Sequence, residues 1–141
     1  MEIFDRLLSL SQKGFFCAQI MMQLALDTEG KEDQDLIRAM GGLNCGLGYT
    51  GGPCGALTSG CCVISYFAGK GGEDETANPK LNDMIAEYVD WFGKTFDAAY
   101  GGHTCGVIMA GDPEKKKQRC PKLVESSLEK VFDILQKNDI I

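Results

Sequence analysis

Apolar residues recur at helical spacing along most of this chain of 141 residues, in segments that glycine separates. In the last segment, for example, Leu128, Val131, Phe132 and Leu135 fall on one face of a helix. We find no convincing alternation of apolar and polar residues with the period of two that marks a half-buried strand. The pattern therefore predicts an all-α fold, a compact single-domain bundle of about six or seven helices.

Glycine, proline and short polar side chains mark where these helices begin and end. We expect residues 1–141 to form one domain, with neither an internal repeat nor a linker. The longest helix is expected after Asn78-Pro79, a short helix is expected to hold Cys105, and Cys120-Pro121 is expected to open the last one. The other expected helices are Glu2–Gln12, Phe15–Asp27, Glu32–Met40 and Pro53–Ala68, and the longest ends near Tyr100.

The composition is that of an ordinary globular protein, with 44% hydrophobic and 24% charged residues. The net charge of −6 opposes general binding to nucleic acid or to an anionic membrane surface. No apolar run approaches the roughly 20 residues that span a bilayer. We therefore expect neither a nucleic-acid partner nor membrane insertion, and the sequence leaves open whether the protein forms a homo-oligomer.

Seven cysteines are many for a chain of this length, and their number is odd. The opening residues Met1–Arg6 lack the charged and then apolar layout of a secretory signal. We therefore expect a cytoplasmic protein, where structural disulfides are uncommon and gathered cysteines more often serve metal or redox chemistry.

Four of the cysteines, Cys17, Cys54, Cys105 and Cys120, fall where a helix is expected to begin. A helix N-terminus offers unpaired N–H groups and a partial positive charge, which favour the thiolate, the reactive and metal-binding form of cysteine. Four such placements predict one site that gathers sulfur. Single distant cysteines can converge in this way, although the paired spacing of a typical zinc site is missing.

The remaining cysteines and the histidine, His103, carry weaker signals. Cys61 and Cys62 are adjacent in the middle of a predicted helix, where cysteine usually serves as a small core residue. Cys45 lies in a glycine-rich stretch and is either a bystander or an accessory thiol. His103 fits a helix cap or a surface residue best, with a ligand or a base for Cys105 as the alternative.

The glycine-rich stretch Gly41–Ala56 includes Gly46-Leu47-Gly48-Tyr49-Thr50-Gly51, a literal match to G-x-G-x-x-G. The dinucleotide fingerprint needs a preceding strand, and here a helix precedes it, so the loop more plausibly packs close to Cys54. The basic run Lys115–Arg119 directly precedes Cys120. It is either a solvated loop or a set of cations that lower the pKa of the Cys120 thiol or offset an anionic cluster.

These cysteines resemble the pattern of a bacterial and archaeal family named C…GCAxxG…C…C, whose members are single domains described as redox-active. The segments that match the family motif are Phe16-Cys17-Ala18-Gln19, Pro53–Thr58, Gly102–Cys105 and Cys120 before the last helix. Ser59 stands where the resemblance leads us to expect a glycine. The resemblance implies a redox role, a site of four cysteines and, by analogy with related modules, an iron–sulfur cluster.

Our leading hypothesis is a small redox protein with a redox partner protein, in which the four cysteines line one pocket. They either bind an iron–sulfur cluster, most plausibly [2Fe–2S], or cycle between thiol and disulfide, with Cys54 as the nucleophile. The first alternative is a non-redox module that binds zinc or a soft metal through four thiolates. The second is a helical interaction protein whose cysteines belong to the core.

Overall fold

The computed structural model of the protein describes residues 2–102, 104, 108 and 113–141, and every regular element among them is helical. This confirms the all-α class. The first half contains α1 (Ile3–Gln12), α2 (Cys17–Thr28), α3 (Gln34–Met40), the 3₁₀ turn η1 (Gly41–Leu43) and α4 (Asn44–Tyr49). The second half contains α5 (Gly55–Ala68), α6 (Leu81–Phe92), the π-helical turn η2 (Gly93–Asp97), α7 (Ala98–Tyr100) and α9 (Pro113–Lys137).

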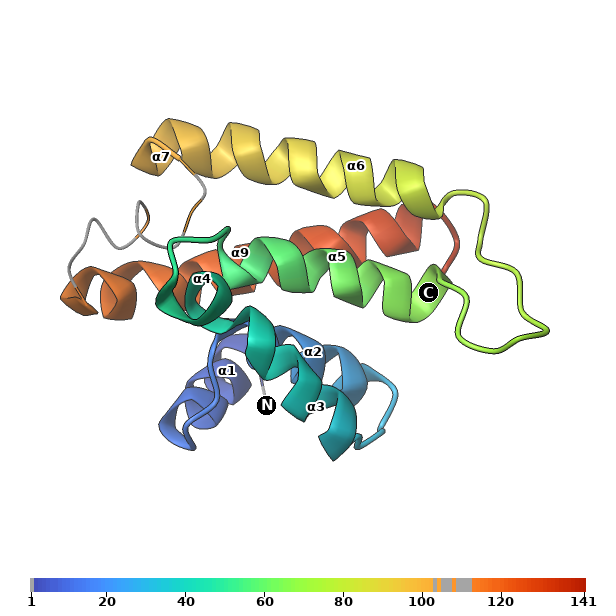
Figure 1. Ribbon diagram of the computed structural model, residues 1–141, viewed down its shortest axis with the longest axis horizontal. Helices are drawn as coiled ribbons and strands as arrows, with labels where there is room; N and C mark the ends of the chain where they lie inside the picture. The colour runs from blue at the N-terminus through green and yellow to red at the C-terminus, as the bar shows by residue number, and fades with distance from the viewer. Residues whose placement is uncertain (1, 103, 105–107, 109–112) are drawn as a thin grey trace.

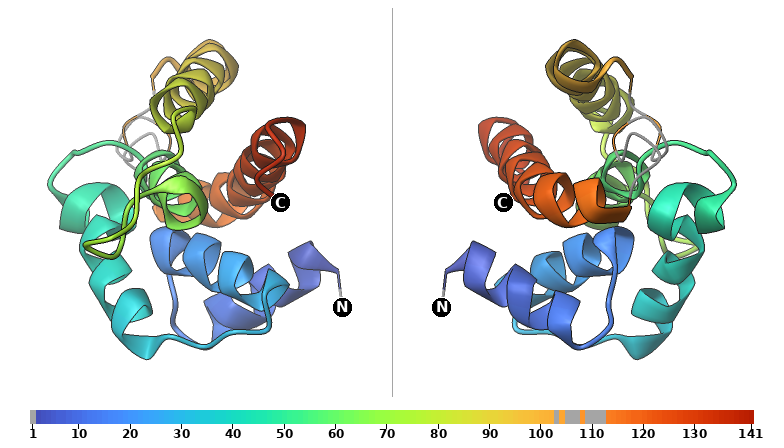
Figure 2. Two further views of the ribbon diagram at one scale, coloured as in Figure 1. Left: turned by 90° about the vertical axis from the view of Figure 1, so that its right-hand side faces the viewer. Right: turned by 90° about the vertical axis from the view of Figure 1, so that its left-hand side faces the viewer.

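Helix α5 occupies the centre and contacts α2, α6 and α9. In Figure 1, α5, α6 and α9 run along the long axis of the molecule, with α1, α2 and α3 packed beneath them. The end-on views in Figure 2 show α5 enclosed by the other helices. One end of this arrangement brings α4, the start of α5, α7 and the start of α9 into the same region (Figure 1).

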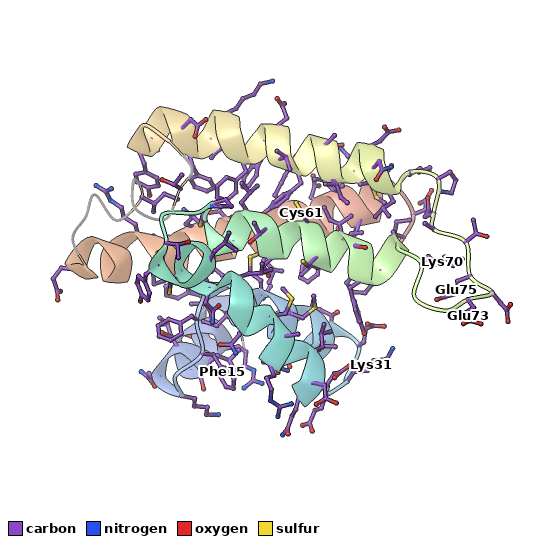
Figure 3. The ribbon with its side chains drawn as sticks, viewed as in Figure 1. Phe15, Lys31, Cys61, Lys70, Glu73 and Glu75 are labelled. Atoms are coloured by element: carbon purple, nitrogen blue, oxygen red, sulfur yellow. The ribbon has the colours of Figure 1, made fainter. Side chains whose placement is uncertain are left out.

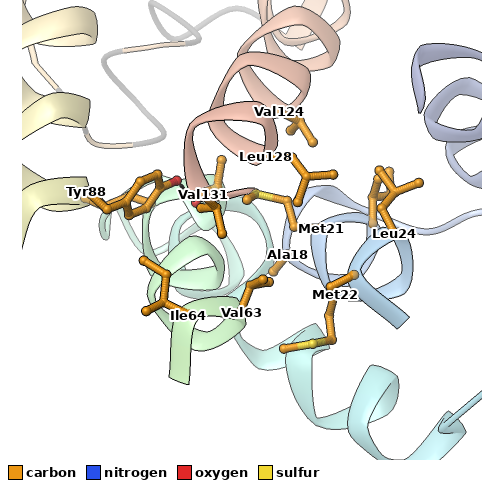
Figure 4. Packing of buried hydrophobic residues seen from close by; sticks show 14 of the residues in the cluster. Ala18, Met21, Met22, Leu24, Val63, Ile64, Tyr88, Val124, Leu128 and Val131 are labelled. Atoms are coloured by element: carbon orange, nitrogen blue, oxygen red, sulfur yellow. Dashed lines mark hydrogen bonds between the residues drawn. The ribbon is translucent and has the colours of Figure 1, made fainter. Parts of the chain in front are cut away.

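The core lies where α5 meets its neighbours, and Figure 4 shows its packing. Met21 of α2, Ile64 of α5 and Leu128 of α9 are fully buried there. Helix α5 is apolar over most of its circumference, as expected of a helix that has neighbours on several sides. Its buried residues are Gly55, Ala56, Leu57, Ser59, Gly60, Val63, Ile64 and Ala68.

Tyr88 of α6 fixes the spacing between α6 and α5. Its side chain is fully buried, and its hydroxyl donates a hydrogen bond of 2.7 Å to the carbonyl oxygen of Ala56. The ring lies against Gly60, where an added Cβ would come within 2.3 Å of ring atoms. Glycine at position 60 therefore allows the aromatic ring to reach the backbone of α5 near its first turns.

Most helix boundaries agree with the sequence, and two expectations are wrong. The last helix begins at Pro113 and not at Cys120-Pro121, so Cys120 lies inside α9 and Pro121 is an internal proline. Asp112-Pro113 carries the same start signal as Cys120-Pro121, and the earlier signal is the one that the fold uses. Helix α9 is also longer than the continuous segment formed by α6, η2 and α7, which we expected to be the longest helix.

Two further points concern the extent of the described structure. The expected placements of His103 and Cys105, together with the short helix around Cys105, lie outside the described residues. Among the residues that are described, each helix is too short or too polar to cross a membrane.

We predict that Gly60→Ala destabilises the protein by about 1–3 kcal/mol, because the new methyl group would overlap the buried ring of Tyr88. Gly93→Ala is the matched control, since its nearest contact would be Asp97 Oδ2 at 3.6 Å. Urea unfolding of both variants measures the difference. Equal stability of Gly60→Ala and the parent protein would contradict the packing described here.

Candidate functional site

Two of the predicted cysteines stand at helix N-termini, as the sequence indicates. Cys17 is the first residue of α2, and Cys54 immediately precedes α5. Cys54 is 5% exposed, whereas Cys17 and Cys120 are half-buried. The two helix starts therefore present one buried sulfur and one that is partly open to solvent.

The start of α5 approaches the start of α2 closely. A Cβ atom built on Gly55 would lie 2.5 Å from Cys17 Sγ and 2.9 Å from the carbonyl oxygen of Leu43. Heavy atoms do not approach so closely, so glycine at position 55 is required for this arrangement. The sulfur of Cys17 therefore lies against the backbone residue that follows Cys54.

Hydrogen bonds from three segments hold the first turn of α2 in place. The backbone N–H of Ala18 donates to Asn44 Oδ1 at 3.1 Å, and Asn44 Nδ2 donates to Gln19 Oε1 at 3.0 Å. Gln19 Nε2 in turn donates to the carbonyl oxygen of Ile37 at 3.3 Å. From α5, Ser59 Oγ donates to the carbonyl oxygen of Ala18 at 2.9 Å. Cys17 is thus positioned by contacts on its immediate chain neighbours.

Burial raises the pKa of the Cys54 thiol to about 12. The backbone N–H groups of Ala56 and Leu57 lower it, while negative charge on Cys17 and Cys120 would raise it further. Our expectation that a helix start favours the thiolate is therefore wrong for Cys54, because loss of solvent outweighs the two amides. Cys17 lies against Gly55, the residue after Cys54, and Cys120 lines the same pocket as Cys17.

Cys17 and Cys120 both line a pocket of about 350 Å³. Phe15, Phe16 and Tyr49 contribute aromatic rings to it. The remaining residues that line it are Leu7, Ser11, Ile20, Pro121 and Val124. Two of the four predicted cysteines therefore line the same pocket, together with apolar residues of α1, α2 and α9 and with Tyr49 of α4.

Tyr49 ends a left-handed turn that lies beside the cysteines. Residues 45–49 all have positive φ, between 58° and 74°. Left-handed conformation costs a residue other than glycine roughly 1–2 kcal/mol, and Cys45, Leu47 and Tyr49 adopt it here. Gly52 N–H donates to the carbonyl oxygen of Gly46 at 3.0 Å and helps to close the turn. Strained backbone of this kind often accompanies functional sites.

The fourth predicted cysteine, Cys105, lies outside the described residues. Its described neighbour Thr104 forms an isolated antiparallel bridge with Pro53, the residue before Cys54. Of the basic run, Arg119 has a described side chain. Its guanidinium lies 4.7 Å from the centroid of the Tyr100 ring and donates to the carbonyl oxygen of Ile108 at 2.7 Å. Arg119 thus ties α9 to α7 and Ile108.

Cys45, Cys61 and Cys62 are not among the described residues that line the pocket. Cys61 and Cys62 pack against the hydrophobic core, as expected, and Cys61 lies between α5 and α6 (Figure 3). Burial raises the pKa of the Cys61 thiol to about 11, and the neighbouring Cys62 adds to that effect. Cys45 is 3% exposed within the left-handed turn.

Two of the candidate metal ligands, His103 and Cys105, lie outside the described residues. Among the residues that are described, no three Cys, His, Asp or Glu side chains are grouped as metal ligands. The site as described is a group of thiols around a pocket.

The chain matches a family model over residues 15–134, most of its length. That family is described as "Putative redox-active protein (C_GCAxxG_C_C)". The chain belongs to this family. The matched range includes Cys17, Cys54, Cys105 and Cys120. No curated protein and no solved structure matched the chain.

Three residues around the site, Ser59, Asn44 and Tyr49, were not identified from the sequence as site residues. Ser59, which replaces an expected glycine, is fully buried and links α5 to the residue after Cys17. Asn44 and Tyr49 belong to the surroundings of the site, yet neither was singled out as a site residue. The alternation of glycine in residues 46–48 was the signal for an unusual turn, but it does not predict positive φ at Leu47 or Tyr49.

We predict that replacing Leu47 by glycine gives a more stable protein than replacing it by alanine, by about 1 kcal/mol, because glycine accepts positive φ without strain. The control pair is Val89→Gly and Val89→Ala in α6. There the alanine variant should have the higher free energy of unfolding, by a similar amount, because glycine destabilises a helix. Urea unfolding measures all four. The same order at both positions would contradict a left-handed turn.

We also predict that Cys54 makes stability fall at high pH. A thiol whose pKa is raised by folding contributes stability that is complete below its unfolded pKa and is lost as pH rises toward about 12. Above about pH 9, the advantage of the parent protein over Cys54→Ala should shrink by about 1.4 kcal/mol per pH unit. Denaturant unfolding under reducing conditions measures it, and a constant advantage would show that Cys54 is solvated.

Proposed function

We propose that this protein exchanges electron pairs with a redox partner protein by dithiol–disulfide chemistry at Cys17, Cys54 and Cys120, with Cys105 as the fourth cysteine of the site. The observation that carries the proposal is that Cys17 Sγ lies against Gly55, the residue after Cys54, and that Cys17 and Cys120 line the same pocket. Three cysteines that are distant in sequence are therefore brought to one region of the fold. Family membership supports a redox role for them.

The exposure of each thiol indicates which cysteine attacks the partner first and which resolves the mixed disulfide. A thiol that attacks a partner must be reachable, and Cys17 and Cys120 both line the pocket, whereas Cys54 is buried and holds its proton at neutral pH. Cys54 was our predicted nucleophile. We now propose that Cys17 or Cys120 makes the first attack and that Cys54 resolves the mixed disulfide.

The proposed reaction balances within the two proteins. A thiolate of Cys17 or Cys120 attacks the disulfide of the partner, so one sulfur–sulfur bond forms as another breaks. A second cysteine of the site then attacks the mixed disulfide, its proton passes to the partner sulfur that leaves, and the partner is released as a dithiol. The site has lost two electrons and two protons, which the partner has gained.

A [2Fe–2S] cluster on Cys17, Cys54, Cys105 and Cys120 is the second candidate. It is favoured by the packing of Cys17 against the residue after Cys54, by the pocket that Cys17 and Cys120 share, and by the bridge between Thr104, the residue before Cys105, and Pro53. The grouping of the described ligands does not favour it. When bound, such a cluster would supply transfer of single electrons.

We predict that anaerobically purified protein titrates as a two-electron couple in thiol–disulfide redox buffers. Cys54→Ser should remove the couple, because Cys54 resolves the mixed disulfide whether Cys17 or Cys120 attacks first, whereas Cys62→Ser should retain it as the matched control. Counts of iron and acid-labile sulfide on the same samples separate the two candidates. About two of each per chain would favour the cluster, and neither iron nor a titrating couple would contradict both.

A further inference from the structure

The pocket beside Cys17 and Cys120 is the right size for a small molecule. Its volume of about 350 Å³ falls in the range of ligand sites, which runs from about 300 to 1,000 Å³. Sulfurs from α2 and α9 are on its wall, and Tyr49 of α4 closes another side. Phe15 lies on the α1 side of this region (Figure 3). A bound molecule would therefore be held next to the thiols.

The chemistry of the wall narrows the class of molecule. None of the described residues that line the pocket carries a charged side chain, although the protein as a whole has a net charge of −6. A phosphate, a carboxylate or a nucleotide would find no cation among these described lining residues, and burying a charge without a partner is costly. The pocket therefore suits a neutral ligand.

The aromatic residues favour a flat ring. Phe15, Phe16 and Tyr49 supply aromatic surfaces, which interact well with another ring in stacked or edge-on geometry. The hydroxyl groups of Ser11 and Tyr49 add donors and acceptors without charge. A neutral ring that carries carbonyl oxygens matches both kinds of group.

We infer that this pocket binds a small quinone and that the thiols reduce it. The inference rests on the proposed dithiol function. Two thiols of the site form one sulfur–sulfur bond and give up two electrons and two protons, and the quinone takes up both to become a hydroquinone. Quinone and hydroquinone are both neutral, so the uncharged wall accommodates the ligand before and after the reaction. A partner dithiol then reduces the disulfide of the site, which is the reverse direction of the dithiol–disulfide exchange described above.

Duroquinone is a suitable probe, because its four methyl groups block addition of thiols to the ring. We expect reduced protein to consume duroquinone under anaerobic conditions with a rate that saturates, and the protein to lose two hydrogens in mass. The double variant Phe16→Ala with Tyr49→Ala should raise the half-saturating concentration about tenfold. Both side chains are exposed, at 44% and 64%, so the fold should survive.

Leu47→Ala is the matched control, since Leu47 belongs to the same turn, is 42% exposed and does not line the pocket. Its half-saturating concentration should stay near that of the parent protein. A rate that rises linearly with duroquinone and is the same in all variants would overturn the inference, because it would indicate collision with accessible thiols. So would a protein that cycles in thiol–disulfide buffers but leaves duroquinone unreduced.

A measurement of binding without chemistry separates this inference from the proposed function. Cys17→Ser with Cys120→Ser removes both sulfurs from the pocket wall and should abolish reduction of duroquinone. Thermal unfolding of that variant should still show stabilisation by duroquinone, and the stabilisation should be lost when Phe16→Ala and Tyr49→Ala are added. Absence of stabilisation would overturn the pocket assignment even where the dithiol chemistry is confirmed.

Discussion

The N-termini of α2 and α5 meet with so little space between them that residue 55 can carry no side chain. Cys17 Sγ occupies the position that a Cβ on Gly55 would enter, at 2.5 Å. Ser59 and Asn44 hold the chain on the C-terminal side of Cys17, and Tyr88 holds α5 through the carbonyl oxygen of Ala56. The juxtaposition of Cys17 and Cys54 depends on these contacts.

The same close packing controls the reactivity of Cys54. Helix N-termini are usually said to activate cysteine, and two amides of α5 do act on Cys54 in that direction. Burial acts in the opposite direction and is stronger, so the Cys54 thiol is protonated at neutral pH. The position of a cysteine relative to a helix therefore sets its pKa only when exposure is also known. Here the difference in exposure separates Cys54 from Cys17 and Cys120.

The left-handed turn of residues 45–49 shows where strain is placed. It brings Tyr49 to the pocket wall and leaves Cys45 buried. Gly46 and Gly48 adopt positive φ with little strain, but Leu47 and Tyr49 do not. Because Tyr49 is 64% exposed, burial of its ring explains little of this cost. Strain held beside a pocket is consistent with a role for the turn in that pocket.

The helices could be predicted from the sequence, because the spacing of apolar residues and the glycines that end a helix are features of neighbouring residues. It also placed Cys17 and Cys54 at helix starts. It failed for Cys120, since Pro113 and Pro121 give the same start signal and tertiary packing selects between them. Glycine is required at position 55 because Cys17, which is distant in the chain, packs against it. Tyr49 likewise lines the pocket together with residues of other segments. A single sequence does not reveal such contacts.

The central claim is that Cys17, Cys54 and Cys120 form one redox group, and mapping of disulfides tests it most directly. Protein that is oxidised under mild conditions is alkylated, digested and analysed by mass spectrometry for linked peptides. We predict a link between members of the set Cys17, Cys54, Cys105 and Cys120, with Cys61 and Cys62 alkylated as thiols. Oxidation confined to Cys45, Cys61 or Cys62, with the four others still reduced, would contradict it.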